Sequence, residues 1–376
     1  MRLWRSKGLL VLFCFVLLTG CWDQRQFKDL KLVLITAFDK TDDELLRATV
    51  AIPTVARGTE GSSKELSEVA SATGRTPRET RSNINQEISK TFDASKLEVI
   101  LVGKELVEQD LYPILDVFYR DPKSNLNSKL AMIDGEAGDV LSLQVDNEPR
   151  INSYVNGLLK GMIKSTYAPK ENIQLICAEL LEPGQDFGLP VMTVNYEENL
   201  LDYKGLGLFN ENKYSGVDLD VEQTLMLLLM NNKKGVDATM TKKVTDRHED
   251  KLKNYLSVNV IDADSKTKID ATSPEDIKVK ITTDLTAKVI EFPEDNLDNV
   301  EKVKRLSKEY SEILTEDGQE ILKIIQEANC DYFGIGRQIK AYHPEIWKQM
   351  KWKDVYPNIE LSVEFNVKMN QHGIIN

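Results

Sequence analysis

The chain has 376 residues, and its 60 acidic side chains outnumber the 48 basic ones to give a formal net charge of −12. Such acidity argues against a protein that binds nucleic acid, because the phosphate backbone would be repelled. It argues equally against electrostatic attachment to anionic lipid. The length is enough for two or three domains, each with a core of its own.

The N-terminus predicts an export signal over residues 1–20. Arg2, Arg5 and Lys7 form a basic lead, and residues 9–18 are wholly apolar. A run of this length is too short to cross a bilayer, which takes about 20 residues, but it suits the hydrophobic region of a signal peptide. We therefore expect the segment to be removed on export.

The end of this signal predicts a lipid anchor at Cys21. Leu18-Thr19-Gly20-Cys21 places two small residues before the cysteine, so a lipoprotein peptidase can reach the Gly20–Cys21 bond. The Cys21 thiol would carry diacylglycerol and the new amino group a further acyl chain, which meets the two-anchor requirement for stable attachment. Cleavage would remove three cations and no acid, and so take the net charge from −12 to −15. The competing interpretation is an uncleaved signal anchor, or an ordinary cleavage with Cys21 incidental.

The first half of the mature chain predicts alternating strands and helices, which is typical of an α/β layout. Strands are expected at 31–39, 45–53, 97–103, 129–134 and 191–196. Helices are expected at 76–89, at 111–121 and over most of 150–182. The first helix is expected to begin with a capping box. Thr76 is the N-cap, Pro77 takes the first helical position, and the Glu79 side chain bonds back to the backbone N–H of the N-cap. Residues 57–75, rich in Gly, Ser and Glu, predict a mobile surface loop.

The second half predicts an α+β domain built on long alternating strands. It opens with a hairpin that turns at Asn210-Glu211-Asn212, and Leu225, Leu228 and Leu229 then begin an amphipathic helix. Strict alternation predicts strands at 278–291 and 358–369, each with one apolar face. Apolar residues at helical spacing over 298–330 predict a helix that covers these faces.

These elements predict a multidomain body of mixed α/β and α+β character. We expect a signal peptide at 1–20, an N-terminal α/β region at 21–198 that could comprise two subdomains, and a C-terminal α+β domain at 199–376. There is no internal repeat and no heptad pattern long enough for a coiled coil.

The sequence contains few residues or motifs that indicate catalysis or metal binding. Apart from Cys21, the mature chain keeps Cys177 and Cys330, which could form one disulfide, although buried free thiols are the preferred interpretation. Nucleophile elbows, phosphate-binding loops and dinucleotide fingerprints are missing. We therefore expect no catalytic residue, no metal and no cofactor. The three histidines form no metal-binding pattern and are expected at the surface: His248, His343 and His372.

Four further polar segments are better explained by structure than by chemistry. Gly334-Ile335-Gly336-Arg337 follows a helix rather than a strand, which favours a glycine turn between helices over an anion-binding loop. Asp42–Glu44 and Asp262–Asp264 lack calcium-loop spacing and predict solvated turns. The charged stretch Lys242–Lys253 predicts an exposed face.

Several segments together carry a family resemblance. Cys21-Trp22-Asp23 directly follows the signal, and the C-terminal end combines Asp331 and Phe333–Gly336 with two tryptophans. The remaining segments are VILVGKEL (99–106), DVFYRDP (116–122), Gly205–Phe209 with Lys213–Gly216, Pro344, Trp347, Trp352 and a last strand ending near Gly373. In these features the chain resembles the Ger(x)C family, the C-type lipoprotein subunits of nutrient germinant receptors in endospore-forming bacteria.

The chain departs from the family pattern in three mild ways. Gln26 stands where an acidic residue is frequent, Gly207 replaces a common alanine, and Ile335 replaces a common phenylalanine. These changes affect packing or local charge and bear on the subgroup more than on the family.

The resemblance implies three mixed α/β domains, unrelated to common enzyme folds. It also implies a receptor in the spore inner membrane, with two membrane-embedded partners of the A and B types. Such a receptor answers to amino acids, sugars or other nutrients, and its signal leads to release of ions and dipicolinate. Only Cys21 maps onto a residue with a defined chemical role. Packing of the last helix on the final sheet is favoured over partner contact for Trp347, Trp352 and the Phe333–Gly336 turn.

Two other classes compete with a receptor subunit. A lipid-anchored solute-binding protein of a transporter would show two similar α/β lobes joined by hinge crossings, whereas this chain changes from α/β to α+β partway. An envelope hydrolase would need a nucleophile–base pair, and the sequence presents none.

Overall fold

The computed structural model describes residues 29–57, 63–294 and 297–371. The predicted signal peptide, Cys21, Gln26, His372 and Gly373 lie outside these ranges. The mixed α/β and α+β character expected from the sequence is confirmed, with helices and several sheets along the whole described chain.

Eight strands of the described chain form one mixed sheet. In chain order they are β2 (Ile35–Lys40), β3 (Leu46–Arg57), β4 (Ser63–Gly74), β6 (Val99–Gly103), β7 (Lys129–Ile133), β8 (Gly188–Asn195), β9 (Leu200–Asn210) and β10 (Lys213–Leu219). Their order across the sheet is β10-β9-β8-β7-β6-β2-β3-β4, with a parallel centre and antiparallel strands on both sides. A separate parallel pair joins β1 (Leu30–Leu32) to β5 (Thr91–Asp93).

Helices cover both faces of this sheet because each presents an apolar stripe to it. One face shares its buried cluster with α2 (Pro77–Glu87), α3 (Lys104–Val107), α4 (Tyr112–Arg120) and α7 (Ile173–Leu181). The other shares a cluster with α5 (Ala137–Val140) and α6 (Ile151–Lys164). The parallel strands are therefore buried on both sides, which explains the unbroken apolar run of β6.

The C-terminal part is a four-stranded sheet covered on one face by a long helix. The strands β11 (Thr239–Lys243), β12 (Tyr255–Ser273), β13 (Asp276–Glu291) and β14 (Glu360–Gln371) follow one another in that order across the sheet. α9 (Val300–Glu327) lies on their apolar face and approaches β14 closely, because Gly318 leaves room for Phe365. The predicted helix and its role as a cover are confirmed.

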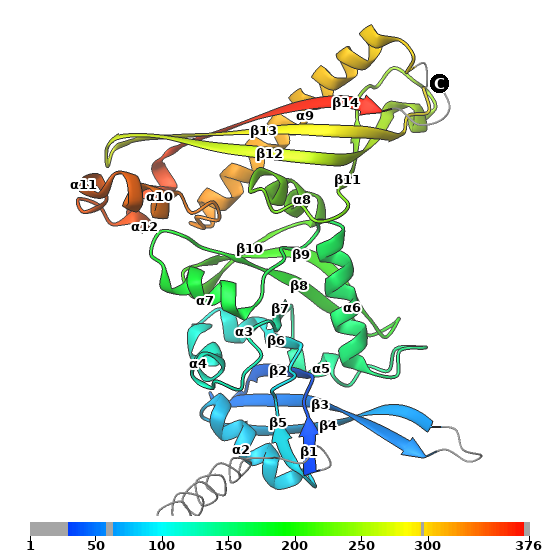
Figure 1. The fold of residues 1–376 in the computed structure, drawn as a ribbon, viewed down its shortest axis with the longest axis vertical. Helices are drawn as coiled ribbons and strands as arrows, with labels where there is room; N and C mark the ends of the chain where they lie inside the picture. Colours follow the sequence, from blue (N-terminus) through cyan, green and yellow to red (C-terminus); the bar gives the residue numbers. More distant parts are fainter. Residues whose placement is uncertain (1–28, 58–62, 295–296, 372–376) are drawn as a thin grey trace, which may run out of the picture.

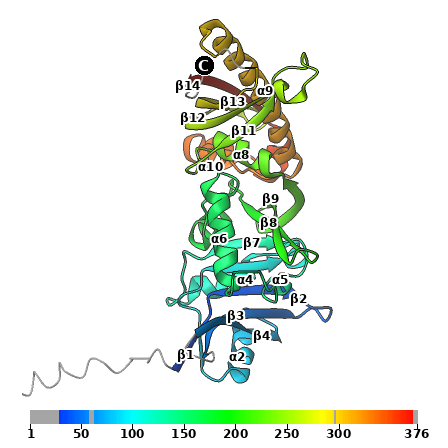
Figure 2. The same cartoon turned by 90° about the vertical axis from the view of Figure 1, so that its right-hand side faces the viewer.

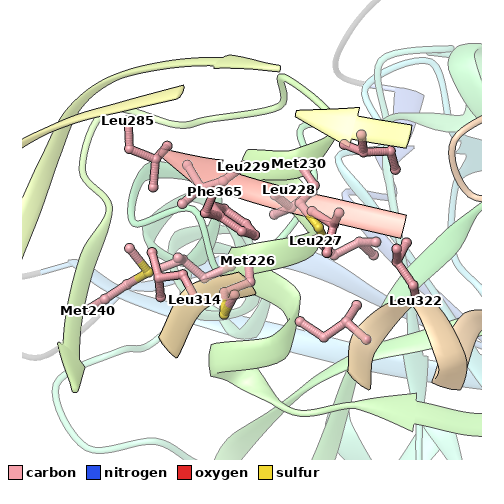
Figure 3. Close-up of a cluster of buried hydrophobic side chains, with 14 of the residues drawn as sticks. Met226, Leu227, Leu228, Leu229, Met230, Met240, Leu285, Leu314, Leu322 and Phe365 are labelled. Carbon is pink, nitrogen blue, oxygen red and sulfur yellow. The ribbon is translucent and has the colours of Figure 1, made fainter. Parts of the chain in front are cut away.

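A short helix, α8 (Val221–Met230), is enclosed between the two sheets. Every residue from Thr224 to Met230 is buried, and α8 contacts β9, β12 and α9. Figure 3 shows its Met226–Met230 side chains among Leu314, Phe365 and other residues of the C-terminal core. The expectation of an amphipathic helix was wrong, since a helix that packs on two sheets must be apolar all round.

The remaining short helices gather near one end of the four-stranded sheet. They are α10 (Ile335–Tyr342), α11 (Pro344–Trp347), α12 (Trp352–Val355) and the 3₁₀ turn η4 (Tyr356–Asn358), while a further turn, η3 (Lys251–Asn254), precedes β12. Figures 1 and 2 show an elongated molecule, with β1 and α2 near one end and β12–β14 with α9 at the other.

The surface loop expected at 57–75 was wrong over residues 63–74, which form β4. This strand pairs with β3 from Leu46↔Gly74 to Arg57↔Ser63. β4 is the edge of the large sheet, where polar and charged side chains are tolerated and help to prevent further pairing. Its composition therefore resembled that of a loop.

The solvated turn expected at Asp262–Asp264 was also wrong. These residues lie inside β12, which pairs with β13 over most of its length. Over residues 262–272 the outward side chains of β12 are Asp, Lys and Thr, and the inward ones are mostly small or polar, so this part of β12 lacks the apolar content by which strands are recognised. The turn expected at Asp42–Glu44 is confirmed.

The charged stretch at 242–253 is only partly the exposed face that was expected. The Lys242 side chain is 13 % exposed and forms ion pairs with Glu222 and Asp317. Most of its neighbours up to Lys253 are exposed or half-buried.

The predicted division of the chain at residues 198 and 199 stays a prediction. The eight-stranded sheet runs across this point, because β8 precedes it and β9 and β10 follow it.

Candidate functional site

The C-terminal residues that carry the family likeness converge on the carboxylate of Asp331. Its Oδ1 accepts a hydrogen bond from the backbone N–H of Ile335 at 2.9 Å, and its Oδ2 accepts one from Gly336 at 2.8 Å. The indole Nε1 of Trp352 donates to Oδ2 at 3.0 Å. Asp331 is 1 % exposed. The carboxylate therefore caps α10 and holds α12 against it with charge-assisted bonds out of reach of water.

A second buried carboxylate, Asp186, ties this turn to the segment between α7 and β8. Asp186 Oδ2 accepts from the N–H of Asp331 at 2.8 Å, and Oδ1 accepts from the N–H of Glu211 in the β9–β10 turn at 2.7 Å. In return, the Asp186 N–H donates to the Asp331 carbonyl at 2.9 Å. We call residues 184–187, 330–337 and 352–356 together the junction, because they join the large sheet to the C-terminal part.

Two glycines let the backbones of the junction meet. A Cβ on Gly336 would lie 2.5 Å from Trp352 Nε1 and 2.8 Å from the Cα of Gly184. The N–H of Arg337 donates to the Gly184 carbonyl at 2.8 Å. Gly334, with φ of +63°, begins α10 in the left-handed region that favours glycine. The predicted glycine turn between helices is confirmed for Gly334, whereas Ile335, Gly336 and Arg337 already belong to the first turn of α10.

Burial changes the acidity of both carboxyl groups. It raises the pKa of Asp331 to about 7, although the hydrogen bonds from Gly336 and Ile335 act in the opposite direction. It also raises the pKa of Asp186 to about 6, against the bonds from Glu211 and Asp331. The junction therefore takes up protons near neutral pH.

The two tryptophans of the likeness are half-buried and pack close to each other. The ring centroids of Trp347 and Trp352 lie 6.0 Å apart, and those of Trp352 and Tyr356 lie 5.6 Å apart. Tyr356 is buried and donates from its hydroxyl to the Cys330 carbonyl at 2.8 Å. Both tryptophans are half-buried and pack against the apolar cluster of the C-terminal sheet, as the packing interpretation predicts.

The segment VILVGKEL has a comparable arrangement at the carboxyl ends of the central strands β2 and β6, whereas the junction lies at the amino end of β8. The Asp39 carboxylate, 2 % exposed at the end of β2, accepts from the N–H groups of Ala137 at 2.6 Å and Gly138 at 2.8 Å. A Cβ on Gly103 would lie 2.4 Å from Asp39 Oδ1. This explains the glycine between strand and helix in that segment. Burial raises the pKa of Asp39.

The remaining candidate residues play no part in this arrangement, apart from Cys330. Cys177 and Cys330 are both free thiols, as preferred, although Cys177 is half-buried rather than buried. His248 contacts Glu294 at 3.2 Å, and His343 directly precedes α11. Within the described residues no three His, Cys, Asp or Glu side chains are grouped to hold a metal ion.

Asp186 and Gly184 of the junction were not predicted from the sequence. The available signal was Pro183-Gly184, a turn dipeptide, followed by an aspartate just before an apolar strand. That signal places a turn, but it cannot indicate that the turn contacts a segment about 150 residues further along the chain.

The sequence as a whole matches two families of known domains. Residues 23–194 match the spore germination protein N-terminal domain, and residues 204–373 match the spore germination B3/GerAC-like C-terminal domain. The chain therefore belongs to the Ger(x)C family of spore germination proteins.

Individual relatives agree over nearly the full length. The chain is 26% identical to spore germination protein GerQC of Bacillus cereus, covering 98% of this chain and 99% of the relative. It is 25% identical to spore germination protein A3 of Bacillus subtilis (strain 168), covering 98% of each. Among solved structures it is similar in fold to the GerBC protein, with a TM-score of 0.53 at 17% identity, over 88% of this chain and 96% of that one.

None of the helices within the described residues combines the length and the apolar character needed to cross a bilayer.

Proposed function

We propose that this chain is a lipid-anchored, non-catalytic C-type subunit of a nutrient germinant receptor. Cys21 holds it on the outer face of the spore inner membrane, beside two membrane-embedded partners of the A and B types. Spores need it to respond to their nutrient and to germinate.

The observation that carries this proposal is the family match over both halves of the chain. It begins at residue 23, two residues after the predicted acylation site, which is where the body of a lipoprotein processed at Cys21 would start. The buried carboxylates of the junction support a non-catalytic role, because backbone and indole donors engage their oxygens for structural purposes.

The solute-binding alternative is less well supported. A transporter-associated binding protein consists of two similar lobes, whereas the described chain combines an eight-stranded mixed sheet with a four-stranded one of different order. We therefore retain the receptor subunit as the proposal.

The proposal is tested by nutrient-triggered dipicolinate release from spores carrying Cys21→Ala. Without the thiol no lipid can be attached, so we expect the protein to leave the membrane fraction. The response to one nutrient set should then fall to the level of a deletion strain, while other triggers still work. Cys177→Ala, which removes a half-buried free thiol, is the matched control and should respond like wild type.

The opposite result would be an unchanged response to every nutrient while the Cys21→Ala protein is missing from the membrane. In a strain without paralogous receptors, that result would contradict a role in germination.

A further inference from the structure

The edge strand β14 of the four-stranded sheet is hydrogen-bonded by side chains of α9. Its outward backbone N–H groups donate to four α9 residues spaced four apart, which we call the row. Val363 N donates to Gln319 Oε1 at 3.3 Å, Phe365 N to Thr315 Oγ1 at 3.0 Å, Val367 N to Ser311 Oγ at 2.9 Å and Met369 N to Ser307 Oγ at 3.4 Å. These oxygens stand where the carbonyl groups of a neighbouring strand would otherwise accept.

The hydroxyl groups of the row can accept these bonds because their own protons are engaged within α9. Ser311 Oγ donates to the Ser307 carbonyl and Thr315 Oγ1 to the Ser311 carbonyl, both at 2.8 Å. Such bonds back to the preceding turn slightly destabilise a helix. The row is therefore better explained by the strand that it faces than by the helix that carries it.

Gly318 brings α9 close enough for the row to reach β14. A Cβ on this residue would lie 2.8 Å from Phe365 Cε2 and 3.0 Å from Val363 Cγ1. Glycine weakens a helix interior, so its place inside α9 has a cost. A larger residue would hold α9 further from β14 and take the oxygens out of bonding distance.

Without α9, β14 would be suited to pair with the same strand of a second copy. Its twelve residues include neither Pro nor Gly, and its side chains alternate between buried and outward-facing. In an antiparallel pair centred on Glu364, Glu360 would lie opposite Lys368 of the second copy, and Ser362 opposite Asn366. Opposite charges and polar groups facing each other in this way favour strand pairing. The pair would have two-fold symmetry and would use the N–H groups that the row now binds.

We propose that α9 takes the place of a fifth strand and closes the β14 edge against pairing with a second copy of the chain. The edge is a latent two-fold interface, and the row keeps it shut. This closure is independent of the role proposed for the chain in germination.

Disulfide cross-linking of the full chain in detergent micelles tests the proposal. In the pair centred on Glu364, the two copies of this residue lie directly opposite each other with Cα atoms about 4.5 Å apart, which a disulfide can span. Glu364→Cys therefore reports the pair. Asn366→Cys is the matched control for register, because its two copies would lie roughly 13 Å apart. The chain without an introduced cysteine gives the background.

We expect slow cross-linking of Glu364→Cys while the row is intact. Adding Ser311→Ala, Thr315→Val and Gln319→Leu removes three acceptors and should speed cross-linking roughly tenfold, while Asn366→Cys stays slow. Glu312→Ala with Glu316→Ala, at exposed positions of α9 outside the row, is the matched control and should leave the rate unchanged.

A second variant opens the edge by another route. Gly318→Val keeps every oxygen of the row but pushes α9 away from β14. It should speed cross-linking of Glu364→Cys in the same direction as the triple variant.

Three outcomes would overturn the proposal. The first is a triple variant with the circular dichroism of wild type that cross-links no faster through Glu364→Cys. The second is equally fast cross-linking with the row intact. The third is equal acceleration through Asn366→Cys, which would indicate contact without the expected register. If the triple variant does not fold, Thr315→Val alone loses the bond from Phe365 and should give a smaller acceleration, and an unchanged rate would count against the proposal.

Discussion

Single residues in this protein are constrained by the close approach of neighbouring segments. Gly103 ends β6 beside Asp39 of β2, and the Asp39 carboxylate binds the start of α5. A glycine is required there because any side chain would occupy the position of the carboxylate. The same principle applies to Gly336, which faces Trp352 and Gly184.

Gly103→Ala should therefore destabilise the fold by about 1–3 kcal/mol, since its Cβ would lie 2.4 Å from Asp39 Oδ1. Urea unfolding followed by circular dichroism measures the loss. Gly157→Ala is the control, because a Cβ on this exposed residue of α6 meets nothing within 4 Å. Since alanine favours a helix more than glycine does, this substitution should raise the free energy of unfolding by up to about 1 kcal/mol. Equal effects of the two substitutions would contradict this explanation.

At the scale of elements, α8 shows how a short helix can hold two sheets together. Its ten residues are too few to be stable alone, so it depends on its caps and on burial between β9, β12 and α9. The N-terminus is fixed by a capping box: Gln223 N donates to Asp220 Oδ1 at 2.8 Å, and Asp220 N donates to Gln223 Oε1 at 3.0 Å.

Asp220→Ala removes this cap and should cost about 1 kcal/mol of unfolding free energy. Hydrogen exchange should also quicken at the N–H of Gln223, which loses its acceptor. Asp220→Asn keeps an oxygen at the cap and should remain close to wild type. A similar loss in both variants would show that the charge of Asp220, rather than its hydrogen bond, stabilises α8.

At the scale of the whole molecule, the large sheet and the C-terminal part are joined by buried carboxyl groups that titrate near neutral pH. Asp331 and Asp186 have pKa values of about 7 and about 6, whereas carboxyl groups in an unfolded chain titrate near 4. Between these values the folded protein binds more protons than the unfolded chain. The stability contributed by these protons is present in full below pH ~4 and is lost as the pH rises through 6 to 7.

Unfolding free energy should therefore fall between pH 5 and pH 8, measured by urea denaturation at constant ionic strength. Asp331→Asn removes the largest part of this titration, so its stability should depend less on pH than that of wild type. An equally steep dependence in the variant would contradict the assignment to Asp331.

Much of the fold could be predicted from local patterns. The continuous run of β6, the alternation in β13 and β14 and the helical spacing in α9 are signals of burial within one element. The edge strand β4 and the polar face of β12 could not be predicted, because strand formation there depends on a paired neighbour and not on apolar content.

The sequence by itself determined the predicted lipid anchor at Cys21, the α/β and α+β order and the family, because these depend on short motifs and on periodicity. Only the tertiary structure decided that Asp331, Asp186 and Trp352 meet in the junction. It also decided that Glu171 and Glu179 lie beside Lys233. The physical reason is that a hydrogen bond or ion pair needs atoms within a few ångströms. Positions far apart in the chain, such as Glu171 and Lys233 at 62 residues or Asp186 and Asp331 at 145, carry no local sign of that proximity.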